Sequence, residues 1–453
     1  MTRARRGGLL LILLSSVIVI VWGSALVRAT NGRSMVGGMG DFKIYFGASR
    51  CLLQHSDPYS PRAVEGVYRA MGWEIPRDPV QFQGATVDVN LPTTFILIAP
   101  FAMLPWGAAH LLWMTLTAAS LTLAAILFWI VARNRAPGVS LFLICFLLAN
   151  CEMVFASGNA GGVVVSLCAI AVWCFLEERF VPAGILCMAV SLAIKPHDVG
   201  LVWLYFLLAG GALRKRALQS LAVTVVLGLS AFLWVSHVAP NWMQEWRSNM
   251  AALSAPGGLN QPGPASVSSQ SANMVVDLQA VVSIFWKDPH IYNPVSYAVC
   301  GALLLVWSVC TFRLPFSKAT AWLSLAAIVP LSMLVTYHRP YDAKLILLTV
   351  PACAMLWAEG GPIGWIALSM TTAGVVLTGD IPLAILSILA RNLNGSAAGI
   401  PWQLLTMVLL QPASLILLLM GIFYLWVYSR RSITSLPTGP RNSVHESPET
   451  ATA

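Results

Sequence analysis

Long apolar stretches separated by short polar loops make up most of this chain. A helix that crosses a bilayer needs about 20 apolar residues, and somewhat shorter variants are tolerated. By this criterion the sequence predicts about twelve spanning helices, near residues 8–28, 106–132, 139–156, 160–177, 181–195, 197–212, 217–238, 295–312, 319–336, 343–358, 363–378 and 401–428. The pattern therefore predicts an all-α, polytopic membrane protein.

The positions of Lys and Arg predict which side of the membrane each loop faces, because short basic loops favour the cytoplasm. With a cytoplasmic N-terminus, alternation of the helices places every basic short loop inside: those with Arg133 and Arg135, Arg179, Arg214 to Arg216, Arg313 and Lys318, and Arg430 and Arg431. The apolar piece 91–104 would break this alternation if it crossed. It is short and contains Pro92 and Pro100, so we expect an interfacial or re-entrant helix on the outer side.

Alternation also predicts how the chain is organised. Residues 1–431 are expected to form one transmembrane domain, with a structured first extracytoplasmic loop at 29–105, a long outer loop and possible lid at 239–294, and a disordered cytoplasmic tail at 432–453. The first apolar run could instead be a cleaved signal peptide, but its length and the parity of the helices favour a retained helix.

Composition agrees with a membrane protein and excludes several other classes. The chain is 57% hydrophobic, 10% charged and has a mean hydropathy of +0.74, which a set of soluble domains would not show. Its net charge of +9 comes mainly from the predicted cytoplasmic loops, where it matches anionic lipids, and no basic patch indicates a nucleic-acid partner. The cysteines and histidines lack the spacing of a zinc site, so we expect neither a metal nor another cofactor.

Five polar clusters all fall on the predicted outer side. They are Gly40-Asp41-Phe42, residues 158–162, Lys195-Pro196-His197-Asp198, the loop from about Pro240 to Asn293, and Tyr337 to Asp342. Polar groups near hydrocarbon are costly unless they are satisfied, so their gathering on one face predicts a shared site there.

Asp41 is the candidate general base in that site. It begins a predicted helix from Phe42 to Leu53, on the same helical face as Tyr45 and Ala48, and a second short helix is expected from Pro61 to Met71. The alternative is that Asp41 only caps the helix N-terminus, a position that Asp commonly occupies.

Several of these motifs occur in the order found in one family of membrane enzymes. They are Gly40-Asp41-Phe42 with Tyr45 and Ser56-Asp57-Pro58-Tyr59, Pro92 with the apolar run to Pro100 and Leu104-Pro105, Gly158-Asn159, Ala183-Gly184 through Ile194-Lys195-Pro196, and Tyr337 to Asp342. On these residues the chain resembles glycosyltransferase family 87 of the GT-C superfamily, over roughly Gly40 to Pro351. It departs at Asn159, where members often have Gln, and at Asn90-Leu91-Pro92-Thr93, which lacks the usual Tyr and paired Pro.

The resemblance implies a GT-C-like bundle that moves a hexose, often mannose, from a polyprenyl-phosphate donor to a glycolipid or glycan acceptor. The implied outcome is inversion, and the implied location is the extracytoplasmic face of a cell membrane, here a bacterial inner membrane. A lipid phosphate can leave without a general acid if cations neutralise its charge. Asp41 is then the base, Lys195, Arg339 and His338 hold the donor phosphate, and further substrate contacts are expected from Tyr45, Asn159, His197, Asp342 and Glu152.

A purely structural interpretation is also open for three of these residues. Lys195 could be a lysine whose ammonium reaches the membrane interface, Arg339 could pair with Asp342 or Asp198, and His197 could satisfy a local hydrogen bond. Two other functional classes stay open. One is a lipid or sugar transporter, although its ionisable residues normally lie near the bilayer midplane, and the other is a noncatalytic subunit that binds a lipid-linked sugar.

Overall fold

A computed structural model describes residues 18–20, 22–24, 38–255, 258–261, 275–380, 385 and 400–434 of this protein. Most of the first apolar run, residues 262–274 of the long outer loop and the tail from residue 435 lie outside the described residues. The predictions made for those segments therefore stay predictions.

Six helices of the described chain are long and apolar enough to cross a membrane. They are α6 (Trp106–Ala132), α7 (Pro137–Ala149) continued by α8 (Glu152–Ser157), α12 (Gly211–Val238), α15 (Pro289–Arg313), α16 (Lys318–Val335) and α21 (Pro412–Thr434). Each of the six overlaps a predicted span, and some extend it by a few residues. The all-α membrane class is therefore confirmed. The total of about twelve stays a prediction.

The remaining apolar helices are shorter, and prolines account for many of their boundaries. They are α5 (Pro92–Ala102), α9 (Gly161–Leu176), α10 (Val181–Ile194), α11 (Pro196–Ala209), the 3₁₀ helix η2 (Asp342–Thr349), α17 (Val350–Glu359), α18 (Gly361–Leu377) and α20 (Ile400–Leu410). The predicted span 343–358 is divided into η2 and α17. The span 401–428 is broken at Gln411, because the residue before a proline avoids the helical conformation.

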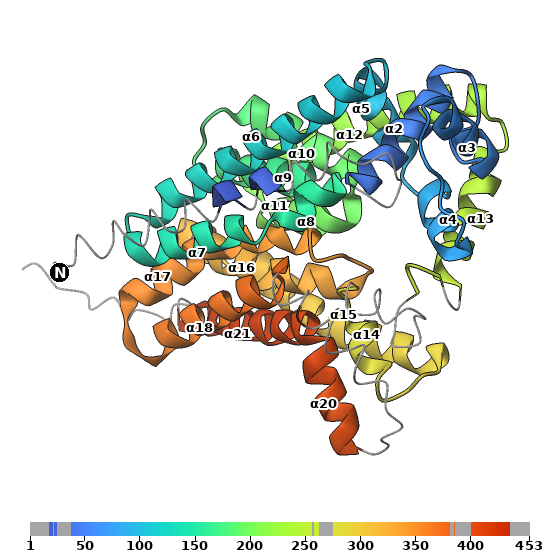
Figure 1. The fold of residues 1–453 in the computed structure, drawn as a ribbon. Coiled ribbons are helices and arrows are strands. Elements are labelled where there is room, and N and C mark those ends of the chain that lie inside the picture. The colour runs from blue at the N-terminus through green and yellow to red at the C-terminus, as the bar shows by residue number, and fades with distance from the viewer. Residues whose placement is uncertain are drawn as a thin grey trace, which may run out of the picture.

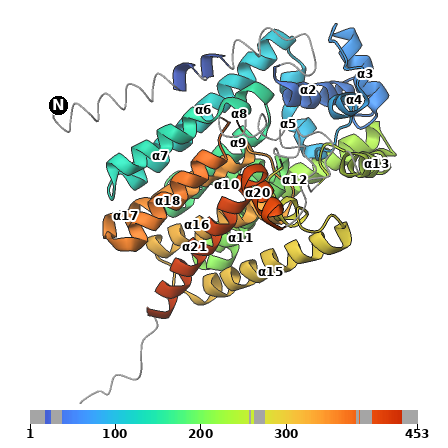
Figure 2. The same ribbon diagram turned by 60° about the horizontal axis from the view of Figure 1, so that its bottom comes forward.

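Short helices form the two loops that were predicted to lie outside the membrane. In the first loop they are α2 (Gly40–Leu53), α3 (Pro61–Ala70) and α4 (Pro79–Thr86), and in the long loop α13 (Trp242–Ser254) and α14 (Leu278–Val282). The first two match the helices expected at 42–53 and 61–71. Figures 1 and 2 show α2, α3, α4 and α13 together at one end, with α17 and α18 towards the other.

Hydrogen bonds fasten α13 to the first loop. The Asn249 side-chain amide donates to the carbonyl oxygens of Tyr59 and Asp88, each at 2.9 Å, and the Trp246 indole donates to the Val89 carbonyl. The first loop and the long loop are thus packed against each other.

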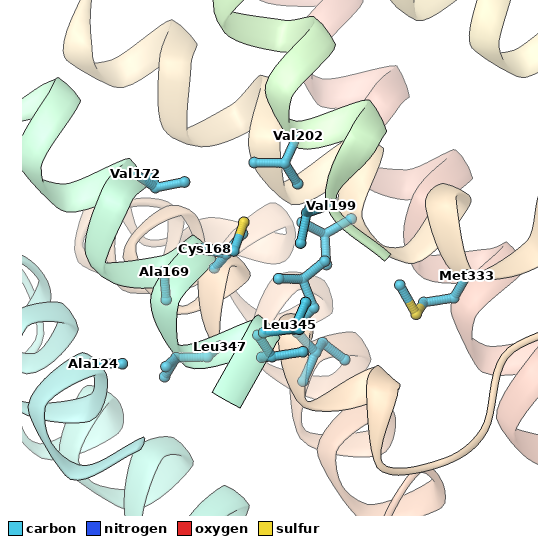
Figure 3. Close-up of a cluster of buried hydrophobic side chains, with 14 of the residues drawn as sticks. Ala124, Cys168, Ala169, Val172, Val199, Val202, Met333, Leu345 and Leu347 are labelled. Atoms are coloured by element: carbon cyan, nitrogen blue, oxygen red, sulfur yellow. The ribbon is translucent and has the colours of Figure 1, made fainter. Parts of the chain in front are cut away.

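The apolar core lies where α6, α9, α11, α16 and η2 meet. Figure 3 shows side chains from all five, among them Ala124, Cys168, Val199, Met333 and Leu345. Helix α16 is mostly buried in this core, whereas α12 exposes many apolar side chains, as a helix that faces lipid does.

Loops with basic residues contact one another at their own end of the bundle. The Lys318 ammonium lies 2.7 Å from a Glu177 carboxylate oxygen, and Arg216 lies 3.1 Å from Glu178. These contacts join loops that alternation places on one side. They agree with the predicted grouping of the loops, while the compartment of each side stays a prediction.

Reporter fusions test that topology. We expect a reporter placed after Lys215 to lie in the cytoplasm and one placed after Pro340 to lie outside, because an odd number of predicted spans separates the two positions. Activity of alkaline phosphatase and of a cytoplasmic fluorescent protein at each fusion gives the compartment. If both positions report the cytoplasm, the shared outer face does not exist.

Candidate active site

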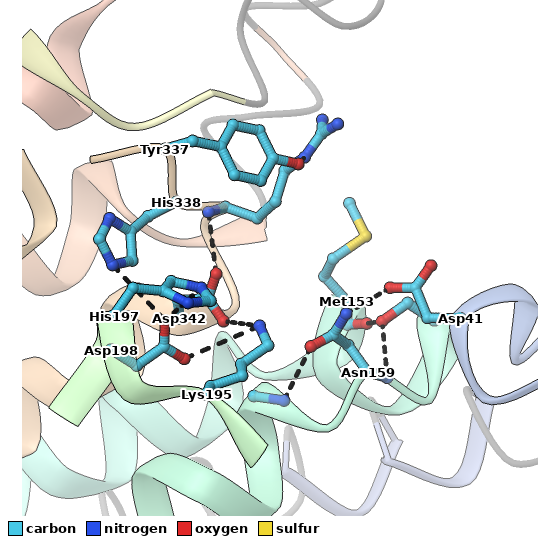
Figure 4. Close-up of polar contacts among 12 residues, drawn as sticks. Asp41, Met153, Asn159, Lys195, His197, Asp198, Tyr337, His338 and Asp342 are labelled. Carbon is cyan, nitrogen blue, oxygen red and sulfur yellow. Dashed lines mark hydrogen bonds and ion pairs between the residues drawn. The ribbon is translucent and has the colours of Figure 1, made fainter. Parts of the chain in front are cut away.

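Asp41 lies in the first turn of α2 and faces the turn between α8 and α9. Its Oδ2 accepts a hydrogen bond from the Asn159 side-chain amide at 2.7 Å. The helix is preceded by Met39 in a left-handed conformation, and no side chain caps it. The N-cap interpretation of Asp41 therefore does not describe this structure, because its carboxylate is directed at another segment (Figure 4).

Asn159 is oriented by its neighbours on both sides. Its Oδ1 accepts the backbone N–H of Gly161 at 2.7 Å, and its Nδ2 donates to the Tyr45 hydroxyl at 2.9 Å as well as to Asp41. Because an amide oxygen only accepts and the nitrogen only donates, the Gly161 contact directs the nitrogen towards Asp41. Asn159 thus holds the candidate base and is itself bonded to Tyr45, while the substrate contacts expected of both residues stay predictions.

Lys195 lies at the break between α10 and α11 that Pro196 imposes. Its ammonium donates to Asp342 Oδ1 at 2.6 Å and lies 3.7 Å from Asp198 Oδ2. Only 9% of the Lys195 side chain is exposed, so the lysine does not reach outward to the interface. A buried ion pair, extended by a second carboxylate, takes the place of the interfacial lysine that was the alternative interpretation.

A glycine allows the Asp41 and Lys195 groups to approach each other. A Cβ atom at Gly161 would collide with Asp342 Oδ1 and would lie 3.3 Å from the Lys195 ammonium and 3.1 Å from Asn159 Oδ1. The small-residue turn at 158–162 is therefore a helix junction that also brings the Asn159 and Lys195 groups together.

Arg339 presents its charge differently from Lys195. Its guanidinium donates to the Tyr337 hydroxyl, to the Leu259 carbonyl at 3.0 Å and to Asn260 Oδ1 at 3.3 Å. Asp342 contacts the backbone of Arg339 and not its guanidinium: the Arg339 N–H donates to Asp342 Oδ2, and the Arg339 carbonyl accepts the Asp342 N–H. Within the described residues no carboxylate oxygen lies within ion-pairing distance of the guanidinium, so the expected alternative, a side-chain pair with Asp342 or Asp198, is not formed.

The histidines and Glu152 are placed less favourably for the donor. His338 is fully buried, its Nδ1 contacts the Thr336 carbonyl at 2.7 Å, and burial lowers its pKa, so it is neutral. His197 is partly exposed and lies 3.2 Å from Asp198. Glu152 begins α8, and Asp342 rather than Glu152 is the carboxylate bonded to Lys195.

All five polar clusters of the sequence meet in this region. Asn159 joins Asp41, Lys195 joins Asp342, and the long loop reaches the same place through Leu259 and Asn260 on Arg339. A single β-bridge between Val276 and His338 adds a further link from that loop. The gathering predicted from polarity is thus seen as direct contacts.

The electrostatics suit a base at Asp41. Burial raises the pKa of its carboxyl, while the hydrogen bond from Asn159 and the charges of Arg339 and Lys195 act against that rise. A carboxylate whose pKa is raised accepts a proton more readily than an exposed one, and a general base is most effective when its pKa approaches the working pH.

A comparison with family models gives a match to glycosyltransferase family 87 over residues 90–337, more than half of the chain. The chain belongs to glycosyltransferase family 87. Comparisons with curated proteins and with solved structures found no match. Membership of family 87 makes the protein a membrane glycosyltransferase, with a sugar donor and an acceptor as its substrates.

The family 87 match covers part of the cluster. Asn159, Lys195 and His197 lie inside the matched range, whereas Asp41 and Arg339 lie outside it and are joined to it by the contacts described above. Sequence reasoning did not find the partners of the two cations. For Lys195, the sequence offered one sign of a partner, because Asp198 lies one helical turn further along the chain. For Arg339, no sequence pattern indicated Leu259 or Asn260 as a partner.

Proposed function

We propose that this family 87 protein transfers a hexose, and specifically mannose, from a polyprenyl-phosphate donor to a glycolipid or glycan acceptor at the extracytoplasmic face of a bacterial inner membrane. The observation that carries the proposal is a half-buried carboxylate, Asp41, that is linked through Asn159 and Gly161 to the region that holds Lys195 and Arg339. A base and two cations are what sugar transfer from a lipid phosphate requires.

In the proposed reaction Asp41 accepts the proton of the acceptor hydroxyl as its oxygen attacks the anomeric carbon. The bond from that carbon to the phosphate oxygen breaks, and the lipid phosphate leaves with both electrons of that bond. Attack opposite to the leaving group inverts the anomeric configuration. Asn159 holds the carboxylate in place through its 2.7 Å hydrogen bond.

Arg339 is proposed as the main donor-phosphate contact and Lys195 as a second positive charge behind it. The guanidinium has neutral oxygen partners, so its charge is available to an anion, and its planar group suits phosphate. Lys195 is already paired with Asp342, which reduces the field that it exerts. His338 is buried and neutral, so we assign it to the structure around the site rather than to the binding of the donor phosphate.

An apolar groove beside Lys195 supports a lipid donor. It runs between α10, α11 and α12 and is lined by Leu192, Pro196, Gly200, Trp203, Leu204 and Leu221. Pro196 is the residue after Lys195, so a polyprenyl tail in this groove would have its phosphate near the cluster. An isoprenoid chain is apolar, so it suits a groove with an apolar lining.

A membrane assay with radiolabelled polyprenyl-phosphate hexoses and extracted lipid acceptors tests the function. We expect the label to move from the donor to a lipid-linked or glycan product in membranes that contain the wild-type chain. A set of donors that differ in the sugar tests the mannose assignment. Binding of the donors without any transfer would instead favour a noncatalytic subunit that binds lipid-linked sugars.

Replacing Arg339 by Ala is expected to weaken donor binding by about 1.5 to 3 kcal/mol, the range for a hydrogen bond to a charged group. Arg339→Lys should recover only part of this, because lysine keeps the charge but loses the planar pair of donors. Donor affinity is measured by titration of detergent-solubilised protein.

The matched control for that titration is Arg247→Ala. Arg247 is an exposed arginine of α13 whose side chain contacts Met243. We expect this variant to bind the donor as the wild type does. Equal donor affinity in Arg339→Ala and the wild type would assign Arg339 to the structure alone.

A further inference from the structure

Two histidines converge on one buried carboxylate behind Lys195. The Nε2 atom of His197 lies 3.2 Å from Asp198 Oδ1, and the Nε2 atom of His338 lies 3.5 Å from the same oxygen. Figure 4 shows the three side chains turned towards one another. Each of the three residues offers one ligand atom, and these three atoms lie within 4.8 Å of one another.

Three buried polar atoms of this group have no hydrogen-bond partner. Both carboxylate oxygens of Asp198 and the Nε2 atom of His338 are buried and make no hydrogen bond. The Nδ1 atom of His338 contacts the Thr336 carbonyl, which only accepts, so in the neutral ring Nδ1 carries the proton and Nε2 presents a lone pair. A lone pair that faces an ionised carboxylate oxygen is repelled unless a proton or a metal cation lies between them.

The charges of the surroundings lead to the same requirement. Lys195 is one ammonium between two buried carboxylates, because it donates to Asp342 and also lies near Asp198 Oδ2. Arg339 and Asp41 add one further charge of each sign, so with all of these groups ionised the carboxylates exceed the cations by one. A buried charge without compensation is strongly unfavourable. We place this excess negative charge at Asp198 Oδ1, because that oxygen faces the two histidines whereas Oδ2 faces Lys195.

We propose that His197, Asp198 and His338 bind a divalent transition-metal ion of the Zn²⁺ type. Ligand bonds of about 2.0 to 2.1 Å at tetrahedral angles separate ligand atoms by about 3.3 Å, close to the two N···O distances seen here. Three protein ligands leave a fourth position open, and the contact of His338 Nδ1 with a backbone carbonyl is the usual support of a metal-bound histidine.

The partly exposed His197 ring gives the ion a route from the outer face, since 41% of its side chain is accessible. The site was not expected from the sequence, because His338 is far along the chain from His197 and Asp198 and no spacing connects them. It goes beyond the proposed transfer chemistry, which requires no metal.

Zinc binding by the wild-type chain tests the site directly. The full chain is purified in detergent through an affinity tag without histidines, stripped with a chelator, incubated with Zn²⁺ and passed through gel filtration. We expect about one zinc per chain by mass spectrometry of the metal, and visible absorption typical of tetrahedral Co²⁺ when cobalt replaces zinc. A wild-type chain that retains no zinc and shows no such absorption overturns the proposal.

Variants assign the ligands. His197→Ala is the most informative because its side chain is partly exposed, and we expect zinc binding to weaken at least about tenfold. His290→Ala, which removes an exposed histidine at the start of α15, is the matched control and should bind zinc as the wild type does. Equal zinc affinity in His197→Ala and His290→Ala, with unchanged melting, would also overturn the proposal.

Discussion

Replacing Asp41 by Asn is expected to lower the rate of sugar transfer by about a hundredfold or more while leaving donor binding nearly intact. An amide cannot accept the proton of the acceptor hydroxyl, and general-base catalysis contributes rate factors of about this size. The size and polarity of the side chain are kept, and the amide can still contact Asn159, so the fold should survive. Turnover, donor affinity and melting temperature are measured on the same preparation.

The structure sharpens the control for this experiment. Asp41→Ala removes the carboxylate to which Asn159 donates, so it should lose both transfer and some stability, whereas Asp41→Asn should lose transfer alone. Near-normal transfer by a well-folded Asp41→Asn variant would exclude Asp41 as the base. The search would then move to Glu152, Asp198 or Asp342.

Replacing Lys195 by Ala is expected to destabilise the folded protein by about 3 to 5 kcal/mol. That is the usual loss when one partner of a buried ion pair is removed and the other charge is left without compensation. Here Asp342 and Asp198, both buried, would lose the ammonium between them. Unfolding by denaturant in mixed micelles measures the change.

Two variants frame that measurement. Lys195→Ala combined with Asp342→Asn should recover part of the loss, because it removes one of the charges left behind. Lys318→Ala is the matched control, since Lys318 pairs with Glu177 at an exposed site and such pairs contribute about 0 to 1 kcal/mol. If Lys195→Ala is as stable as Lys318→Ala, the buried pair is not a structural element.

Much of the fold could be predicted because it depends on local properties of the chain. The length of an apolar run sets the length of a spanning helix, which is why α6, α12 and α15 match their predicted ranges closely. The first-loop helices α2 and α3 were predicted for a similar reason, since proline and helical periodicity act over a few residues. The break inside residues 401–428 follows from Pro412, although the apolar run was long enough to hide it.

The partners within the site could not be predicted in the same way. Polarity indicated that Asp41, Asn159, Lys195 and Asp342 belong to one region, but not which atoms meet. Lys195 and Asp342 are 147 residues apart, and their pairing depends on how close η2 comes to the α10–α11 break. That approach depends on the absence of a side chain at Gly161, which was predicted only as part of a polar cluster at residues 158–162.

The hydrogen bonds of Arg339 bear on what a donor-binding experiment will measure. Leu259 and Asn260 already occupy part of the guanidinium, and their segment is held against α4, because Leu259 packs on Gly84 with no room for a Cβ atom there. A phosphate that takes those N–H groups must displace oxygens of the protein's own chain. The chain thus acts as a tethered competitor, and the observed dissociation constant reports the difference between two sets of hydrogen bonds.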